Sequence, residues 1–291
     1  MTTMTREWVA INGELLPADQ ARVSVFDSGF MQGVGLFETM RLYNGRVFRV
    51  ERHIDRLRGS AARLGWSVVP DEDTLRENVE LAAGAIEQAD ARVRLTVTTG
   101  AVRVTERESP NLTIVATASP ALAYPPEAYQ RGVTAIVAPY RQSRLDPLAG
   151  HKATSYFARL TSLREAYAQS AFESIWLSDD EFVAEGAISN VFIFRGDTLR
   201  TPPLDTPVLP GITRAALIEM AAAARIPCEE AAFNLSDLLS ADEAFLTNSM
   251  MEIVPLVRVG RDAIGTEKPG EQTLRLAHLY RELVQRETAR D

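Results

Sequence analysis

The chain has 291 residues, of which 46% are hydrophobic and 24% are charged, and it carries a formal net charge of −8 at pH 7. This length and composition predict a globular protein whose apolar core is divided between two domains. The acidic balance argues against a nucleic-acid-binding surface and against attachment to an anionic membrane, since both need a basic face.

The first third of the chain predicts two β-hairpins followed by a helix. Residues from Trp8 to Leu16 alternate around Asn12-Gly13, a dipeptide typical of tight hairpin turns. Residues from Leu36 to Val50 repeat this pattern around Asn44-Gly45, so the segments on either side of that turn are expected to pair as antiparallel strands. Apolar residues spaced three and four apart from Ile54 to Leu64 mark one face of a helix.

A Pro-rich stretch, Ser119–Pro126, follows the next elements and is expected to separate the two domains. Before it, a helix is expected over Asp71–Gln88, with strands over Arg92–Thr99 and Leu112–Ala118. We therefore predict a smaller N-terminal α/β domain over residues 1–119, a linker over 120–130 and a larger C-terminal domain over 131–291.

The C-terminal part alternates between strands and helices, which predicts a mixed α/β fold. Gly150 precedes a segment of helical apolar periodicity, so Lys152 is expected near the start of a helix. The triplet Arg195-Gly196-Asp197 is typical of a hairpin turn. The remaining expected elements are strands over Val133–Ala138, Ser174–Leu177 and Asn190–Phe194 and helices over Arg214–Ala224 and Glu271–Thr288.

Lysine is nearly absent, because only Lys152 and Lys268 occur among the 31 basic residues. Arginine stays protonated and cannot form an imine, whereas a lysine amine in apolar surroundings can lose its proton and attack a carbonyl. Lys268 lies in a turn-like Thr-Glu-Lys-Pro-Gly stretch and is expected at the surface. Lys152 is therefore the candidate for covalent chemistry, with chance retention in an arginine-rich chain as the alternative.

Three separated segments carry groups that suit a phosphate. In Pro210–Arg214 a glycine turn opens a helix, where backbone N–H groups, a threonine hydroxyl and the positive helix end favour an anion. Phe245–Ser249 reads as a buried strand that ends in three small hydrogen-bonding residues. Arg56, on a predicted helix, can bind a phosphate in bidentate fashion. Each segment taken alone is equally typical of ordinary helix capping, a strand end or a surface arginine.

Glu185 lies among small residues in the apolar segment Val183–Phe192. A buried carboxylate is costly unless it has a cationic partner. A protonated pyridine nitrogen is one group that could supply the positive charge.

With these motifs in hand, the chain resembles the class IV aminotransferase family, the pyridoxal-phosphate enzymes of fold type IV. The likeness rests on Gly-His-Lys at Lys152, on Glu-Gly-x-x-Ser-Asn-Val-Phe from Glu185 and on Gly-Ile-Thr-Arg from Gly211, in that order. It runs from Trp8 to about Val257. The family includes branched-chain and D-amino acid aminotransferases and 4-amino-4-deoxychorismate lyase.

The resemblance implies a two-domain α/β homodimer that uses pyridoxal 5′-phosphate and no metal. Lys152 would form the Schiff base and carry protons, and Glu185 would pair with the pyridine nitrogen. The implied phosphate ligands are Arg56, Ile212, Thr213 and Ser249, with Leu209 packed against the ring and with Phe37, Arg94 and Tyr156 near the substrate.

Two enzymatic hypotheses remain open. An aminotransferase would pass an amino group from an amino acid to the cofactor and then to a 2-oxo acid. A lyase would instead expel pyruvate from aminodeoxychorismate. The segment Thr99–Arg103 departs from the Arg-Gly pattern of some lyases and D-amino acid enzymes, and Arg103 is a substitute candidate for the substrate carboxylate.

A cofactor-free interaction domain is a third hypothesis, and the retention of both Lys152 and Glu185 argues against it. The single cysteine, Cys228, suits a reducing compartment. The N-terminal residues lack the apolar core of a secretion signal, and no stretch of about 18 apolar residues occurs, so the cytoplasm is the expected location.

Overall fold

The computed structural model describes residues 7–101 and 111–289, which form two compact units. Unit 1 consists of the described residues of Met1–Leu122, His151–Ser155 and Val284–Asp291. Unit 2 consists of Ala123–Gly150 and Tyr156–Leu283. Residues 151–155, which include the candidate lysine, therefore belong with the N-terminal unit although they lie within the expected C-terminal range.

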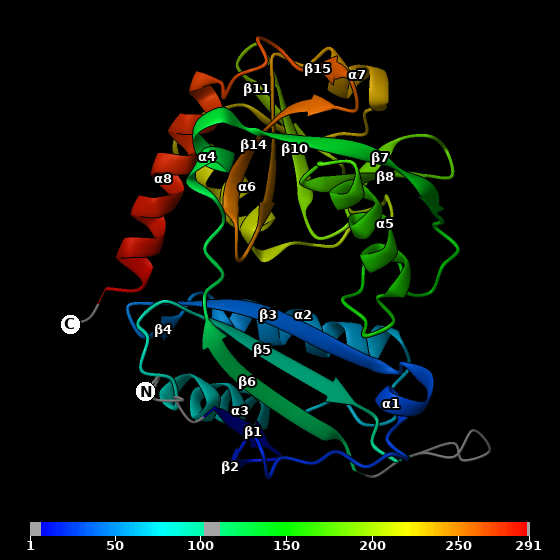
Figure 1. Cartoon of the computed structure of the whole chain (residues 1–291), viewed down its shortest axis with the longest axis vertical. Helices are drawn as coiled ribbons and strands as arrows, with labels where there is room; N and C mark the ends of the chain where they lie inside the picture. Colours follow the sequence, from blue (N-terminus) through cyan, green and yellow to red (C-terminus); the bar gives the residue numbers. More distant parts are fainter. Residues whose placement is uncertain (1–6, 102–110, 290–291) are drawn as a thin grey trace. The chain divides into compact units, whose positions relative to one another are not determined.

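Unit 1 is built on a six-stranded antiparallel sheet in the order β2-β1-β6-β5-β3-β4 (Figure 1). Helices α2 and α3 pack against its strands. The elements are β1 (Trp8–Ile11), β2 (Glu14–Pro17), α1 (Ser28–Gln32), β3 (Gly35–Tyr43), β4 (Arg46–Val47), α2 (Val50–Arg63), α3 (Glu72–Gly84), β5 (Ala91–Thr98) and β6 (Thr113–Pro120).

Both Asn-Gly turns form the expected hairpins. Asn12 and Asn44 have φ of 49° and 53°, the left-handed conformation that asparagine and glycine adopt readily in these turns. The second hairpin is shorter than expected. Arg49 also has a positive φ, 52°, which an extended strand does not allow, so β4 ends at Val47 and α2 begins at Val50.

Unit 2 contains a nine-stranded mixed sheet in the order β12-β11-β10-β13-β14-β7-β8-β9, with β15 paired to β14. The pairs β7–β8, β7–β14 and β11–β12 are parallel, and the others are antiparallel. The strands are β7 (Val133–Gln142), β8 (Glu173–Ser178), β9 (Val183–Gly186), β10 (Asn190–Arg195), β11 (Thr198–Thr201), β12 (Cys228–Glu230), β13 (Glu243–Asn248), β14 (Glu252–Val259) and β15 (Asp262–Ala263).

Three helices of unit 2 pack on this sheet, α4 against β14, α5 against β7 and β8, and α6 against β12 and β13. Arg195-Gly196-Asp197 forms the expected hairpin turn between β10 and β11. None of the described helices combines the length and the apolar character needed to cross a bilayer. The helices are α4 (Pro126–Arg131), α5 (Phe157–Ala168), α6 (Ile212–Ala223), α7 (Leu235–Leu239) and α8 (Glu271–Glu287), whose last residues, from Val284, belong to unit 1.

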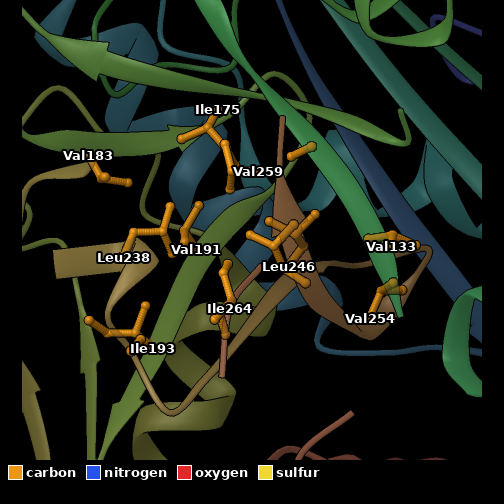
Figure 2. Close-up of a cluster of buried hydrophobic side chains, with 14 of the residues drawn as sticks. Val133, Ile175, Val183, Val191, Ile193, Leu238, Leu246, Val254, Val259 and Ile264 are labelled. Carbon is orange, nitrogen blue, oxygen red and sulfur yellow. The ribbon is translucent and has the colours of Figure 1, made fainter. Parts of the chain in front are cut away.

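The core of unit 2 is a cluster of buried aliphatic side chains from neighbouring strands, including Val191, Leu246 and Val254 (Figure 2). Their strands read as nearly continuous apolar runs because both faces of the sheet are buried. Each such side chain contributes roughly 1.5–3 kcal/mol on burial, so β8, β9, β10 and β13 form a rigid support for the polar residues at their ends.

Candidate active site

Lys152 lies in unit 1, on a segment that hydrogen-bonds to β3. The amide of Phe37 donates to the Lys152 carbonyl at 2.9 Å, and the amide of Thr154 donates to the Gly35 carbonyl at 2.8 Å. The expectation that a helix carries Lys152 near its start is wrong. The backbone of this segment bonds to a strand, and the helix α5 begins only at Phe157.

The Phe37 ring brings two other predicted residues together. The Lys152 Nζ lies 4.6 Å from the ring centroid, and the Arg94 guanidinium carbon lies 3.9 Å from it. Phe37 is only 5% exposed, so both cations approach an aromatic surface that is largely shielded from water. Lys152, Phe37 and Arg94 are therefore neighbours within unit 1.

Arg56, on α2, forms a bidentate ion pair with Glu38 of β3. Its Nε donates to Glu38 Oε1 at 2.8 Å and a terminal nitrogen donates to Oε2 at 2.5 Å, while His53 Nδ1 lies 2.7 Å from Oε2. Burial alone would raise the pKa of Glu38, but the charge of Arg56 and the hydrogen bonds lower it to about 2. Burial lowers the pKa of His53. Arg56 is thus oriented by a buried carboxylate.

The Glu38→Gln variant is expected to be less stable than the wild type by about 3 kcal/mol at pH 7. The folded pKa of Glu38, about 2, lies below its ordinary value of 4.5. The ionised group therefore contributes its full stability above pH 4.5 and loses it as the pH falls toward 2. Urea denaturation at pH 7 and near pH 3 measures the difference, which should shrink at the lower pH. An equal difference at both pH values would contradict the assigned charge.

Glu185, in β9 of unit 2, is buried with 3% exposure. Its Oε1 accepts a charged hydrogen bond from Arg159 on α5, and its Oε2 accepts the Leu209 amide at 3.0 Å. Burial alone would lower the pKa of Arg159, but the charge of Glu185 raises it. The protein itself therefore supplies a cation for this buried carboxylate, and pairing with a pyridine nitrogen stays a prediction.

The Leu209 peptide is fixed on both sides. Its N–H donates to the carboxylate just described, and its carbonyl accepts the Asn190 side-chain amide at 2.9 Å. A Cβ on Gly211 would lie 2.0 Å from Asn190 Oδ1, so a larger residue here would displace the Asn190 side chain that holds the Leu209 carbonyl. The Tyr156 hydroxyl donates to the Ala187 carbonyl at 2.9 Å. Tyr156, Leu209 and Glu185 are thus linked to neighbouring backbone within unit 2.

The start of α6 and the end of β13 carry the residues expected to bind a phosphate. Gly211 is the N-cap of α6 and has no side chain to bond the first-turn N–H groups, while Ile212 and Thr213 are buried. Ser249 lies in the turn after β13, which the Asn248 side chain stabilises by accepting two backbone N–H groups at 2.8 Å. A helix start and a hydroxyl are chemically suited to an anion.

Arg159, Glu38 and His53 were not among the residues expected from the sequence. The sequence did indicate that a buried Glu185 needs a cationic partner, because burying an unpaired carboxylate is costly. It did not identify Arg159 as that partner. Arg103, considered for the substrate carboxylate, lies outside the described residues. Within 7–101 and 111–289 no group of three or more His, Cys, Asp or Glu side chains could hold a metal ion.

The chain matches the family of amino-transferase class IV over residues 35–259. It is 32% identical to a putative branched-chain-amino-acid aminotransferase of Methanocaldococcus jannaschii, covering 94% of this chain and 96% of that one. It is also 32% identical to aminodeoxychorismate lyase of Bacillus subtilis, covering 94% and 93%. The D-alanine aminotransferase of Bacillus licheniformis is 30% identical, with 97% and 99% covered.

Solved structures share the whole fold. The branched-chain amino acid aminotransferase of Escherichia coli superposes with a TM-score of 0.90 at 28% identity, covering 97% of this chain and 96% of that one. The T.th. branched-chain amino acid aminotransferase with pyridoxamine 5′-phosphate gives a TM-score of 0.88 at 25% identity, covering 98% and 95%. These matches confirm the expected mixed α/β architecture of fold type IV.

The donor groups fit pyridoxal 5′-phosphate: a lysine amine for its aldehyde, a buried carboxylate for its ring nitrogen, and uncapped helix N–H groups with a hydroxyl for its phosphate. The family match and the structures that share this fold define an enzyme that depends on this cofactor. The chain belongs to the class IV aminotransferase family, as its motifs had indicated.

Proposed function

We propose that the protein transfers an amino group between an amino acid and a 2-oxo acid, with Lys152 as the Schiff-base residue. The observation that carries this proposal is the place of Lys152, the chain's one lysine besides surface Lys268, against the buried Phe37 ring. Aminotransferases among the relatives support the same reaction type.

Each proposed residue has a defined task. When bound, the cofactor supplies a ring that withdraws electrons from the substrate carbon. The Lys152 amine attaches the cofactor and moves the proton at that carbon, and Glu185 holds a proton on the pyridine nitrogen. Leu209 packs against the ring, while Phe37, Arg94 and Tyr156 bind the substrate. The phosphate is bound by Arg56, Ile212, Thr213 and Ser249.

A direct test compares two reactions of the purified enzyme. Holoenzyme is mixed with D- or L-alanine, glutamate or a branched-chain amino acid, and conversion of the cofactor to its amine form is followed by absorbance. Pyruvate release from aminodeoxychorismate is measured in parallel. Conversion with an amino acid supports amino transfer and identifies the preferred substrate and its handedness. Pyruvate release without any such conversion would contradict it.

The lyase is the second candidate function. A lyase relative at 32% identity that spans 94% of this chain favours it. The same Lys152 and Glu185 would serve both reactions, because each requires electron withdrawal from the same substrate carbon. The parallel assay above separates the two activities.

A homodimer and a cytoplasmic location complete the proposal. Exposed apolar side chains in and beside α1 offer a surface for a second copy, namely Val25, Phe26, Phe30 and Met31. Such a cluster is unusual on a monomer, so the molar mass in solution, measured by light scattering, should equal twice that of the chain. A monomer at all concentrations would contradict it.

The cytoplasmic location rests on the single cysteine.

The Arg56→Ala variant is expected to bind pyridoxal phosphate ten- to a hundred-fold more weakly, since a hydrogen bond to a charged group contributes about 1.5–3 kcal/mol. Thr213→Ala should cost less, because its backbone N–H stays at the helix start. Titration of the apoenzyme with cofactor measures the dissociation constant of each variant. Excess cofactor should restore the occupied fraction, and with it the activity, of both variants.

Arg56→Lys serves as the control, since it keeps a charge beside Glu38 but loses the bidentate geometry. Thermal unfolding of each apoenzyme shows how much stability Arg56 contributes through Glu38. Unchanged cofactor affinity in Arg56→Ala would mean that Arg56 has only this structural role.

A further inference from the structure

Glu173, the first residue of β8, is fully buried and accepts hydrogen bonds from four donors. Its Oε1 accepts the amides of Ser174 at 2.8 Å and Ala187 at 3.1 Å. Its Oε2 accepts the amide of Ile188 at 3.3 Å and the hydroxyl of Ser189 at 2.7 Å. Three of the four donors belong to the consecutive residues 187–189, so one carboxylate holds a whole turn.

The turn is shaped around this carboxylate. The Gly186 amide donates to the Ser189 carbonyl at 2.7 Å, which closes the turn. A Cβ on Gly186 would lie 2.8 Å from Glu173 Oε2 and 2.2 Å from Ser189 Oγ, so only glycine lets the carboxylate approach. Burial raises the pKa of Glu173 to about 7, while the hydrogen bonds act in the opposite direction. Burying this group is costly, and the four donors offset that cost.

One side of the turn leads to Glu185. The carbonyls of Gly186 and Ala187 accept hydrogen bonds from the same Arg159 guanidinium that pairs with Glu185, at 3.2 and 3.3 Å. The Tyr156 hydroxyl also donates to the Ala187 carbonyl. A displaced turn would therefore move the groups that orient the Glu185 carboxylate.

The other side of the turn leads to Ser249. The Ile188 carbonyl accepts the side-chain amide of Asn248 at 3.0 Å. The Oδ1 of Asn248 in turn accepts the amides of Met250 and Met251, which fixes the turn that contains Ser249. Within unit 2, hydrogen bonds thus connect the turn held by Glu173 to Glu185, through Arg159, and to the turn that contains Ser249, through Asn248.

We propose that Glu173 is a positioning residue for the cofactor, holding the turn 186–189 so that Glu185 and Ser249 keep their places. Glu173 is fully buried and presents no surface to a cofactor or substrate, so in this role it acts only through these two residues. This inference rests on the cofactor-binding roles proposed for Glu185 and Ser249.

The Glu173→Gln variant tests the inference. The amide keeps the size and one acceptor oxygen, but its nitrogen cannot accept the Ile188 N–H, and Ser189 must reverse its hydroxyl. We expect the dissociation constant of pyridoxal phosphate to rise about tenfold, as for the loss of one buried hydrogen bond. If this variant does not fold, Ser189→Ala removes one of the four donors and should weaken cofactor binding in the same direction by a smaller factor.

Glu243 offers a matched control in the same unit. Its carboxylate also clamps backbone, accepting the amides of Gln272 at 3.0 Å and Thr273 at 2.7 Å and the Thr273 hydroxyl at 2.7 Å, at the start of α8. Glu243→Gln should lower the thermal midpoint while leaving the cofactor dissociation constant within about twofold. Equal loss of stability with unchanged cofactor affinity in both variants would overturn the inference.

A double-mutant cycle measures whether Glu173 and Ser249 are coupled in cofactor binding, which a purely structural role of Glu173 would not produce. Ser249→Ala should weaken cofactor binding in the wild-type background and have little further effect in Glu173→Gln, because the Ser249 turn is already displaced. Equal effects in the two backgrounds would overturn the inference. These titrations use no substrate, so a failure of the proposed amino transfer would appear only in the separate activity assay. A Ser249→Ala variant without effect in the wild type would instead refute the proposed role of Ser249.

Discussion

Replacement of Lys152 by arginine is expected to abolish amino transfer, lowering the rate by several powers of ten. Arginine keeps the positive charge beside the Phe37 ring, where the lysine Nζ lies 4.6 Å from the ring centroid. The backbone bond between the Phe37 amide and the Lys152 carbonyl does not depend on the side chain. The variant should therefore fold, yet it cannot form an imine. Steady-state turnover at saturating cofactor measures the effect.

The chain provides its own control in Lys268→Arg. Lys268 is exposed and lies in the loop between β15 and α8, so its replacement should leave turnover unchanged. Near-normal turnover in Lys152→Arg would remove Lys152 from the chemistry. Equal losses in both variants would point to a general effect of lysine replacement instead.

Glu185→Gln is expected to reduce the rate by roughly a hundred-fold, about 3 kcal/mol in the barrier, with a much smaller change in cofactor affinity. Glutamine keeps the size and can still accept the Leu209 amide, but it carries no charge. In the proposed role of Glu185, a protonated pyridine nitrogen would lose its counter-charge, and Arg159 loses its anionic partner. Single-turnover rates with amino acid, together with cofactor titration, separate the two effects.

Glu229→Gln is a suitable comparison, because Glu229 pairs with Arg200 at 2.7 Å but is largely exposed. An exposed pair contributes about 0–1 kcal/mol, so turnover in this variant should not change. If Glu185→Gln lowered cofactor affinity while the rate at saturation stayed constant, the charge of Glu185 would have no part in the chemistry.

Features that depend on neighbouring residues were predicted well from the sequence. The Asn12-Gly13 and Asn44-Gly45 turns formed as expected because turn geometry is set by the backbone preferences of two residues. The helices from Ile212 and Glu271 also follow their apolar periodicity. The family was identified from three short motifs whose spacing is specific.

Features that depend on distant partners were missed. The segment at Lys152 has helical periodicity, but its backbone bonds to β3, more than a hundred residues earlier in the chain. The sequence does not distinguish Arg159 from the other arginines, because only the tertiary fold places it beside Glu185. Arg56 was considered alone, and its pairing with Glu38 became visible only when α2 packed on β3. Sequence patterns report local preference, whereas these ion pairs arise from tertiary packing.

The most direct test of the central claim is the location of the covalent bond to the cofactor. The protein is saturated with pyridoxal phosphate and reduced with borohydride, and its peptides are then mapped by mass spectrometry. We expect a single pyridoxyl adduct on Lys152, absent from the Lys152→Arg variant. An adduct on Lys268 alone, or no adduct at all, would contradict the assignment of Lys152 as the Schiff-base lysine.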